Sequence, residues 1–131
     1  MATITGVDVV TIVVEDQEEA LTFYLEELGF HLDQDEEYGD QGRWIEISPP
    51  DSDVSLKLKT PEMFDSDEAV HRRALIGRSP QITYQVGDCM EIFQSLTDRG
   101  IPFEDEPKSK PWGTQATLRD PSGNLVVLTE K

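Results

Sequence analysis

The chain has 131 residues, 37% of them hydrophobic and 29% charged, a composition typical of one folded domain rather than a disordered segment. Twenty-seven acidic against eleven basic residues give a net charge of −16, which disfavours partners such as nucleic acid and anionic membranes. The acidic residues are spread along the whole length. We therefore interpret them as the solvent adaptation of a halophilic protein rather than as a cation-binding patch.

Three further features concern the compartment. Cys89 is the only cysteine, so no internal disulfide can form, as is usual in a reducing compartment. No run approaches the ~20 apolar residues that a membrane span needs. The first residues lack the basic and then apolar layout of a signal peptide. We therefore expect a cytoplasmic location.

The first half of the chain predicts one strand, one helix and three more strands. A near-continuous apolar run predicts the first strand over 7–14. Asp16 is the expected N-cap of a helix that ends near Leu28, before the capping Gly29. Alternating segments then predict strands over 30–36, 43–47 and 54–58, separated by turns at 38–42 and 49–53.

The second half predicts the same order of elements after a linker over 61–80, which includes loop residues Gly77 and Pro80 and a short helix near 67–75. Asp88 is expected to open a second helix over 89–99, which Gly100 ends. The strands of this half are expected at 81–86, 102–104, 115–119 and 124–129, with a tight turn at 120–124. A repeat of about 70 residues indicates two units that pair, with a ligand site between them.

Three motifs stand in order within this duplicated frame. The first runs from Asp16 through Phe23-Tyr24 to Leu28-Gly29-Phe30. The others are Arg43-Trp44-Ile45-Glu46-Ile47-Ser48-Pro49-Pro50 and Asp120-Pro121-Ser122-Gly123-Asn124-Leu125. Together they resemble the glyoxalase/bleomycin-resistance/extradiol-dioxygenase family, the vicinal oxygen chelate superfamily, over essentially the whole chain.

The resemblance implies an α+β fold in which two tandem βαβββ modules form an incomplete eight-stranded barrel around a cavity. It implies a single glyoxalase-like domain over residues 1–131, with modules at about 5–60 and 81–131 and the linker at 61–80. Members of the family are often homodimers, so we expect a homodimer here.

Family chemistry usually depends on a divalent metal held by His and Glu from the first and last strands of each module. The corresponding positions of this chain carry Val9, Ser55, Gln81 and Val127. Valine has no lone pair to donate, and serine and glutamine are weak neutral ligands. Neither His31, beside acidic residues, nor His71, in the linker, has the spacing to replace them. We therefore predict no metal site and no cofactor.

Side-chain alternation predicts which strand residues face away from the helices and toward the cavity. The expected ligand-binding wall comprises Thr11, Trp44, Glu46, Ser55, Lys57, Gln81, Thr83, Gln115, Thr117 and Arg119, with Trp112 on a neighbouring loop and Val9 and Val127 at the floor. Lys57 and Arg119 could hold a carboxylate or phosphate, and the two tryptophans could stack a planar ring. Glu46 is the one candidate general base on this wall, although it could simply pair with either cation.

Three hypotheses for function follow. The first is a metal-independent protein that binds a small organic ligand, anionic or planar, of unknown identity. The alternative is a metal-dependent lyase, isomerase or dioxygenase of the same superfamily whose ligands are not recognised in the sequence, or an enzyme using Glu46 without metal. The third is a non-catalytic dimeric module with a vestigial cavity. Cys89, at a helix start without a nearby histidine, is expected to be a buried small hydrophobe rather than a nucleophile.

Overall fold

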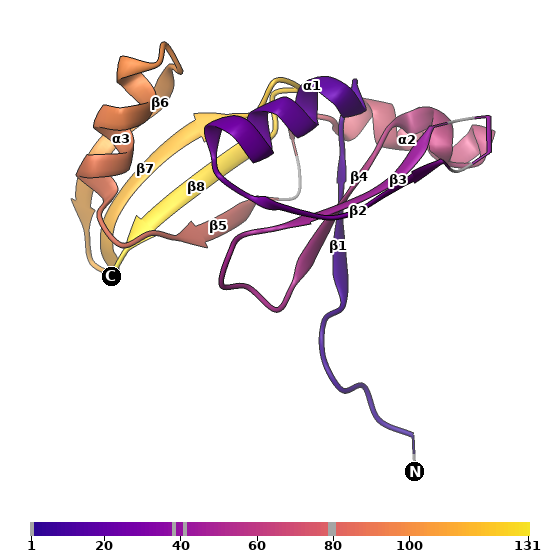
Figure 1. Ribbon diagram of the computed structural model, residues 1–131, viewed down its shortest axis with the longest axis horizontal. Coiled ribbons are helices and arrows are strands. Elements are labelled where there is room, and N and C mark those ends of the chain that lie inside the picture. Colours follow the sequence, from indigo (N-terminus) through magenta and orange to yellow (C-terminus); the bar gives the residue numbers. More distant parts are fainter. Residues whose placement is uncertain (1, 38, 41, 79–80) are drawn as a thin grey trace. The chain divides into compact units, whose positions relative to one another are not determined.

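The computed structural model describes residues 2–37, 39–40, 42–78 and 81–131 (Figure 1). The chain divides into two compact units, Met1–Ala74 and Leu75–Lys131, and the division falls inside the expected linker. Tyr38 and Gln41 of the expected turn at 38–42, and Pro80 of the linker, lie outside the described residues. Each unit is described by itself.

Unit 1 contains a four-stranded sheet in the order β1-β4-β3-β2. Strand β1 pairs with β4 in parallel, and the other pairs are antiparallel. Its elements are β1 (Val9–Val13), α1 (Gln17–Leu21), the π-helical turn η1 (Thr22–Glu27), β2 (His31–Glu37), β3 (Arg43–Ser48), β4 (Ser55–Lys59), the 3-10 turn η2 (Pro61–Met63) and α2 (Ser66–Leu75), whose last residue opens unit 2.

The first helix begins and ends as the sequence predicts. Asp16 caps its start, because the side-chain carboxylate accepts a 2.9 Å hydrogen bond from the backbone N–H of Glu19. Gly29 follows its end with a φ of 77°, a conformation that suits glycine. The helix buries Ala20, Phe23 and Tyr24. Its second half is π-helical rather than α-helical, a feature that apolar spacing does not distinguish.

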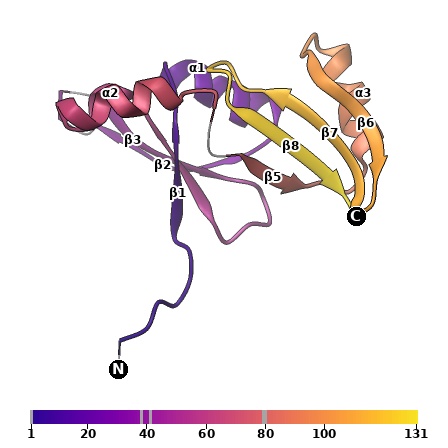
Figure 2. The ribbon, with the colours of Figure 1, turned by 180° about the vertical axis from the view of Figure 1, so that it is seen from behind.

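Unit 2 repeats this plan with a sheet in the order β5-β8-β7-β6. Asp88 caps α3 through a 2.9 Å bond from the N–H of Glu91. The helix packs against β6, β7 and β8 (Figure 2). The elements of this unit are β5 (Ile82–Gln85), α3 (Cys89–Asp98), β6 (Phe103–Lys110), β7 (Gly113–Arg119) and β8 (Leu125–Glu130).

The α+β class and the two βαβββ modules are thus confirmed. The eight strands form two open four-stranded sheets, as an incomplete barrel requires. One strand boundary was wrong, because β6 runs to Lys110 and not to residue 104. Pro107 and the acidic run before it argue against a strand, yet β6 is a sheet edge whose pairing shifts between Asp105 and Lys108. Such an edge tolerates proline.

None of the helices in the described ranges is long and apolar enough to cross a membrane.

Candidate ligand-binding site

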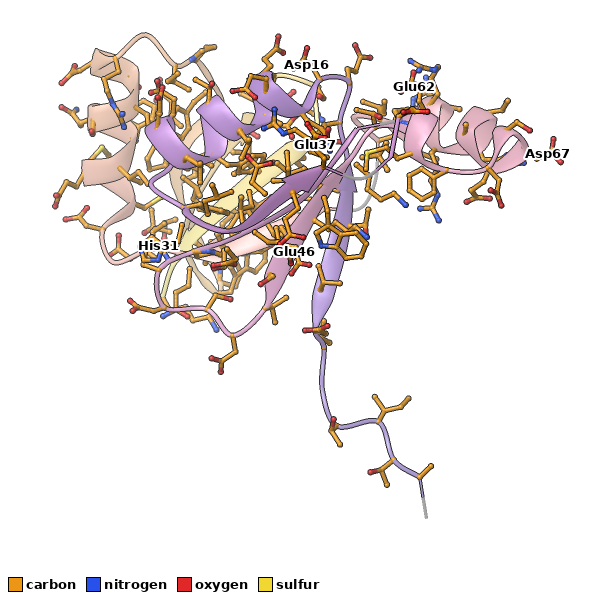
Figure 3. The ribbon with its side chains drawn as sticks, turned by 45° about the vertical axis from the view of Figure 1, so that its right-hand side comes forward. Asp16, His31, Glu37, Glu46, Glu62 and Asp67 are labelled. Carbon is orange, nitrogen blue, oxygen red and sulfur yellow. The ribbon has the colours of Figure 1, made fainter. Side chains whose placement is uncertain are left out.

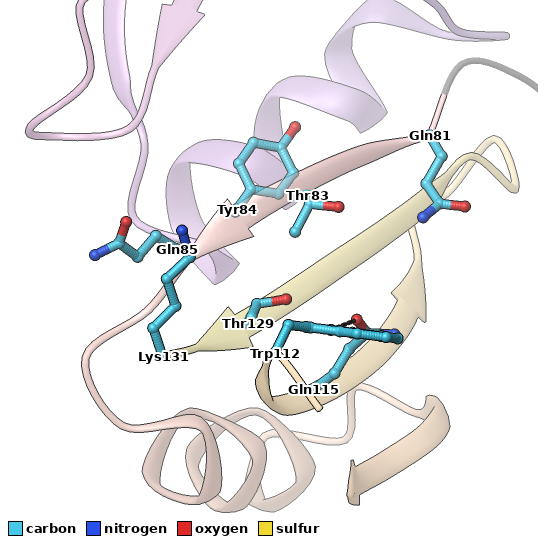
Figure 4. Close-up of a pocket in the computed structure, with 8 residues that line it drawn as sticks. All are labelled: Gln81, Thr83, Tyr84, Gln85, Trp112, Gln115, Thr129 and Lys131. Carbon is cyan, nitrogen blue, oxygen red and sulfur yellow. Dashed lines mark hydrogen bonds between the residues drawn. The ribbon is translucent and has the colours of Figure 1, made fainter. Parts of the chain in front are cut away.

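The pocket in unit 2 lies on one face of its sheet. Helix α3 lies on the other face, where the Glu130 carboxylate accepts a 2.8 Å bond from the N–H of Cys89. The pocket has a volume of about 430 Å³. It is lined by Gln81, Thr83, Tyr84, Gln85, Trp112, Gln115, Thr129 and Lys131 (Figure 4).

A lateral row of three side chains crosses the pocket. In the parallel pair β5–β8, Gln85 is the register partner of Thr129, and in the antiparallel pair β7–β8 Gln115 is the partner of the same threonine. Laterally paired residues point to the same face of a sheet, so two amides flank one hydroxyl. The row offers hydrogen-bond donors and acceptors without a formal charge.

Trp112 stands beside this row in the turn between β6 and β7, with 56% of its surface exposed. Its indole Nε1 donates a 2.8 Å hydrogen bond to Gln115 Oε1 (Figure 4). This bond fixes the ring next to the pocket and leaves the amide nitrogen of Gln115 as a donor. An oriented indole suits the stacking of a planar ring.

Thr129 has an unusual environment for a buried polar residue. It is 4% exposed, and its hydroxyl oxygen has no hydrogen-bond partner among the residues that the structure describes. Nearly all buried polar side-chain atoms in proteins are hydrogen-bonded, so each exception calls for an explanation. Neighbouring atoms cover this oxygen, so a ligand in the pocket would supply the missing partner only after a small local shift of those atoms.

The structure brings together four of the residues that the sequence predicted for this half, namely Gln81, Thr83, Trp112 and Gln115. Two others do not line the pocket. The Thr117 hydroxyl donates to Asp105 Oδ2 at 2.9 Å, and Arg119 pairs with Glu104 at 3.2 Å while donating to two backbone carbonyls. In the absence of a ligand the Arg119 guanidinium is thus paired with Glu104, and its role in binding an anionic ligand stays a prediction.

Four lining residues were missed. Alternation already places Gln85 on this face of β5, although the predicted wall omitted it, and Thr129 lies two positions beyond Val127, so extending the alternation would have found it. Lys131 and Tyr84 could not be found in this way. Tyr84 lies between Thr83 and Gln85 on β5, so alternation assigns its side chain to the opposite face of the sheet. Burial raises the pKa of its hydroxyl, which keeps the hydroxyl neutral.

The expected wall residues of unit 1 also share one sheet face. Lys57 is the register partner of Thr11 on β1 and of Glu46 on β3. The Glu46 carboxylate accepts a 2.7 Å bond from Trp44 Nε1 (Glu46 is labelled in Figure 3). The Lys57 ammonium lies over the Trp44 ring, 3.2 Å from its centroid. Glu46 is thus held by the indole, and its role as a base stays a prediction.

The metal-ligand positions of the family do not fit a metal in this chain. Val9 and Ser55 are register partners, and the Ser55 hydroxyl donates to Asp33 at 3.1 Å. Val127 is buried, and with Gln81 it offers at most one neutral amide oxygen. Within the described ranges no three His, Cys, Asp or Glu side chains come together in a way that could hold a metal ion, and both histidines are exposed. The absence of a metal in the working protein stays a prediction.

Comparison with known proteins identifies the family. The model of the Glyoxalase/Bleomycin resistance protein/Dioxygenase superfamily matches residues 6–128. The chain belongs to this superfamily. The curated relative YurT of Bacillus subtilis is 32% identical over 124 residues, which are 94% of this chain and 97% of YurT.

Two solved structures resemble the whole chain. TnmS3, described as an antibiotic binding protein from Streptomyces sp. CB03234, is 31% identical with a TM-score of 0.78, over 99% of this chain and 98% of TnmS3. A superfamily member from Sphaerobacter thermophilus is also 31% identical, with a TM-score of 0.79 over 98% of both chains.

Proposed function

We propose that this superfamily member binds a small, planar organic molecule in the unit 2 pocket and does so without a metal ion. The observation that carries the proposal is the Thr129 hydroxyl, which is buried in the pocket wall without a partner among the described residues. A ligand that moves the atoms covering this oxygen and bonds to it would remove the cost of leaving a buried hydroxyl unpaired, about 1–3 kcal/mol.

The chemistry of the pocket favours a planar molecule with several polar groups. Trp112 provides a flat apolar surface, and the amides of Gln85 and Gln115 provide hydrogen-bond donors and acceptors at the edge of such a ring. Lys131 adds one positive charge. These features support recognition of a heteroaromatic or carbonyl-bearing ring system.

Binding is better supported than catalysis. None of the eight pocket-lining residues is a carboxylate, an imidazole or a thiol, the usual general bases and nucleophiles. The four family metal positions offer no imidazole or carboxylate either. The description of TnmS3 as an antibiotic binding protein supports the same class of function. We further propose that the protein is cytoplasmic and that it forms a homodimer. Light scattering after size exclusion is the direct test of the homodimer.

The test is an NMR titration of the isotopically labelled protein with 2-naphthamide, a flat uncharged probe whose amide both donates and accepts. We expect shifts of the backbone resonances of Thr83, Gln85, Gln115 and Thr129 and of the Trp112 indole. Trp112→Ala should lower the affinity for the probe by about 2- to 10-fold, because one aromatic contact is lost. Shifts confined to other residues, or none, would overturn the assignment of the pocket.

A further inference from the structure

One hydrogen bond sets the orientation of an amide in the unit 2 pocket. The Trp112 indole nitrogen carries a proton and has no lone pair that accepts a bond, so it acts as a donor only. Its partner at 2.8 Å is therefore the oxygen of the Gln115 amide rather than the nitrogen. The two ends of a glutamine amide are otherwise hard to tell apart, and here the chemistry of the indole decides between them.

The same bond decides what Gln115 presents to a ligand. Because the amide oxygen is turned to the indole, the Nε2 atom and its two N–H groups lie on the other side of the amide. Within the described ranges this nitrogen has no hydrogen-bond partner. Gln115 lines the pocket, so its N–H groups are available to a bound molecule.

Several other polar groups of the pocket wall lack a fixed polarity. The hydroxyl of Thr129 donates or accepts as it rotates. No bond among the described residues fixes the two ends of the Gln85 amide, so that side chain can offer either end. Gln115 differs from both, because the indole holds it with the donor end free.

The lysines at this end of the pocket favour the same kind of ligand group. Lys108 on β6 is the register partner of Gln115, and Lys131 lines the pocket. An ammonium group donates hydrogen bonds and accepts none. None of the eight lining side chains is a carboxylate, and Asp105, farther along β6, accepts the bond from the Thr117 hydroxyl. The groups of fixed polarity around Gln115 are therefore donors, which suit an acceptor.

We propose that Trp112 and Gln115 make the pocket selective for planar molecules that carry a carbonyl oxygen at the edge of the ring. The N–H bond of an indole lies in the ring plane, so Trp112 can orient Gln115 and still stack a ligand on its face. Gln115 is then the specificity-determining residue, and Trp112 is its positioning residue. This inference rests on the proposed function, because it names the class of ligand for the same pocket.

The experiment compares 2-acetylnaphthalene with 2-isopropenylnaphthalene, which have nearly the same shape. The first carries a carbonyl oxygen where the second carries a CH₂ group. In NMR titrations the side-chain amide protons of Gln115 should lie further downfield with the ketone than with the alkene, since both rings shift neighbouring protons alike. Equal positions with the two probes would overturn the inference.

Two substitutions at Gln115 separate loss of the donor from a change in charge. The measured quantity is the ratio of the ketone affinity to the alkene affinity, because the hydration of the two probes cancels when variants are compared. Gln115→Glu still accepts from the indole but has no N–H, and Gln115→Met removes the donor without adding a charge. Both should lower the ratio by about 2- to 10-fold, the contribution of one neutral hydrogen bond. A ratio that falls with Gln115→Glu alone, or with neither, would overturn the inference.

The matched control is Gln94→Glu, which adds the same charge at an exposed position of α3, on the other face of the sheet. It should leave the ratio unchanged. A fall equal to that of Gln115→Glu would reduce the effect to overall charge and overturn the assignment.

Trp112→Phe tests the positioning role. Phenylalanine keeps an aromatic face but has no N–H, so the Gln115 amide becomes free to turn. The ratio should fall by about twofold, because two amide orientations replace one. An unchanged ratio would show that the indole does not orient the amide.

Failure of the proposed function would look different. In that case neither naphthalene probe, nor 2-naphthamide, would shift the resonances of the pocket residues. If all three probes bind in the pocket and the ratio does not respond to Gln115→Glu and Gln115→Met, the proposed function stands and the selectivity for a carbonyl is wrong.

Discussion

The indole nitrogen of Trp112 is joined to the side-chain oxygen of Gln115 by a hydrogen bond of 2.8 Å. The bond links an exposed aromatic ring in a turn to a residue of strand β7. Because the ring is oriented before any ligand arrives, stacking on it costs less conformational entropy than stacking on a mobile side chain would. This arrangement, beside the unpaired hydroxyl of Thr129, is the basis of the proposed ligand pocket.

Thr129→Val tests whether that hydroxyl serves binding rather than folding. Valine has nearly the same shape, and it removes a buried polar atom that has no partner among the described residues. We therefore expect the free energy of unfolding to rise by about 1–3 kcal/mol in urea titrations, while the affinity for 2-naphthamide falls.

Thr117→Val is the matched control for this experiment, because the Thr117 hydroxyl donates to Asp105. Its removal should lower the stability by about 1 kcal/mol and leave probe binding nearly unchanged. If the two variants changed stability in the same direction, the hydroxyl of Thr129 would not be unpaired in solution.

Asp120→Ala tests the turn between β7 and β8. The buried carboxylate accepts hydrogen bonds from the backbone N–H groups of Ser122 and Asn124 and from the Asn124 amide. The Asn124 oxygen in turn accepts a bond from Gly77 N–H. Loss of these bonds should lower the free energy of unfolding by about 3 kcal/mol, measured in urea. Asp98→Ala, at the exposed end of α3, should change it by less than about 0.5 kcal/mol, and comparable losses would contradict the role given to the turn.

Cys89 should react slowly with alkylating agents. The thiol is fully buried, and burial raises its pKa, as do the nearby charges of Glu130 and Asp88. At pH 8 we expect iodoacetamide to modify the folded protein far more slowly than the urea-unfolded chain. Equal rates in the two states would show that the thiol is accessible.

The same pKa shift has a consequence for stability. The folded thiol keeps its proton at a pH where the unfolded thiol loses it, so this contribution is complete below about pH 8.5 and is lost as the pH rises above that value. The free energy of unfolding should therefore fall less between pH 8 and pH 10 for Cys89→Ala than for the unmodified chain. A larger fall in the variant would contradict the direction of the shift.

The acidic surface predicts stabilisation by salt. Repulsion within a net charge of −16 opposes the compact state, and the Debye length shrinks from about 10 Å at 0.1 M to about 3 Å at 1 M. The melting temperature should rise with KCl over this range if the composition is a halophilic adaptation. A melting temperature that is flat or falls with KCl would contradict this interpretation.

Local rules predicted much of the fold from the sequence. The caps Asp16 and Asp88 and the glycine at 29 mark helix ends through hydrogen bonds and backbone angles that depend on nearby residues alone. Alternation assigned Thr83 and Gln115 to the pocket face because successive side chains of a strand point to opposite faces, which is also a local rule. The extent of β6 was not predictable, because an edge strand with an irregular register does not need apolar alternation.

The state of individual polar groups was harder to predict. Alternation places Arg119 and Thr117 on strand faces but says nothing of their partners, Glu104 and Asp105, which are distant in sequence. The unpaired hydroxyl of Thr129 likewise depends on what the neighbouring strands bring beside it. Such pairings are set by strand register, which the sequence specifies only weakly at polar positions.

The central claim is that the chain binds a small planar molecule without a metal ion. The most direct test is equilibrium dialysis of 2-naphthamide against protein stripped with EDTA, and against the same protein supplied with Zn²⁺, Mn²⁺, Ni²⁺ or Fe²⁺. We predict the same affinity in every case. Binding that appears only after a metal is added would contradict the claim and favour a metal-dependent lyase, isomerase or dioxygenase.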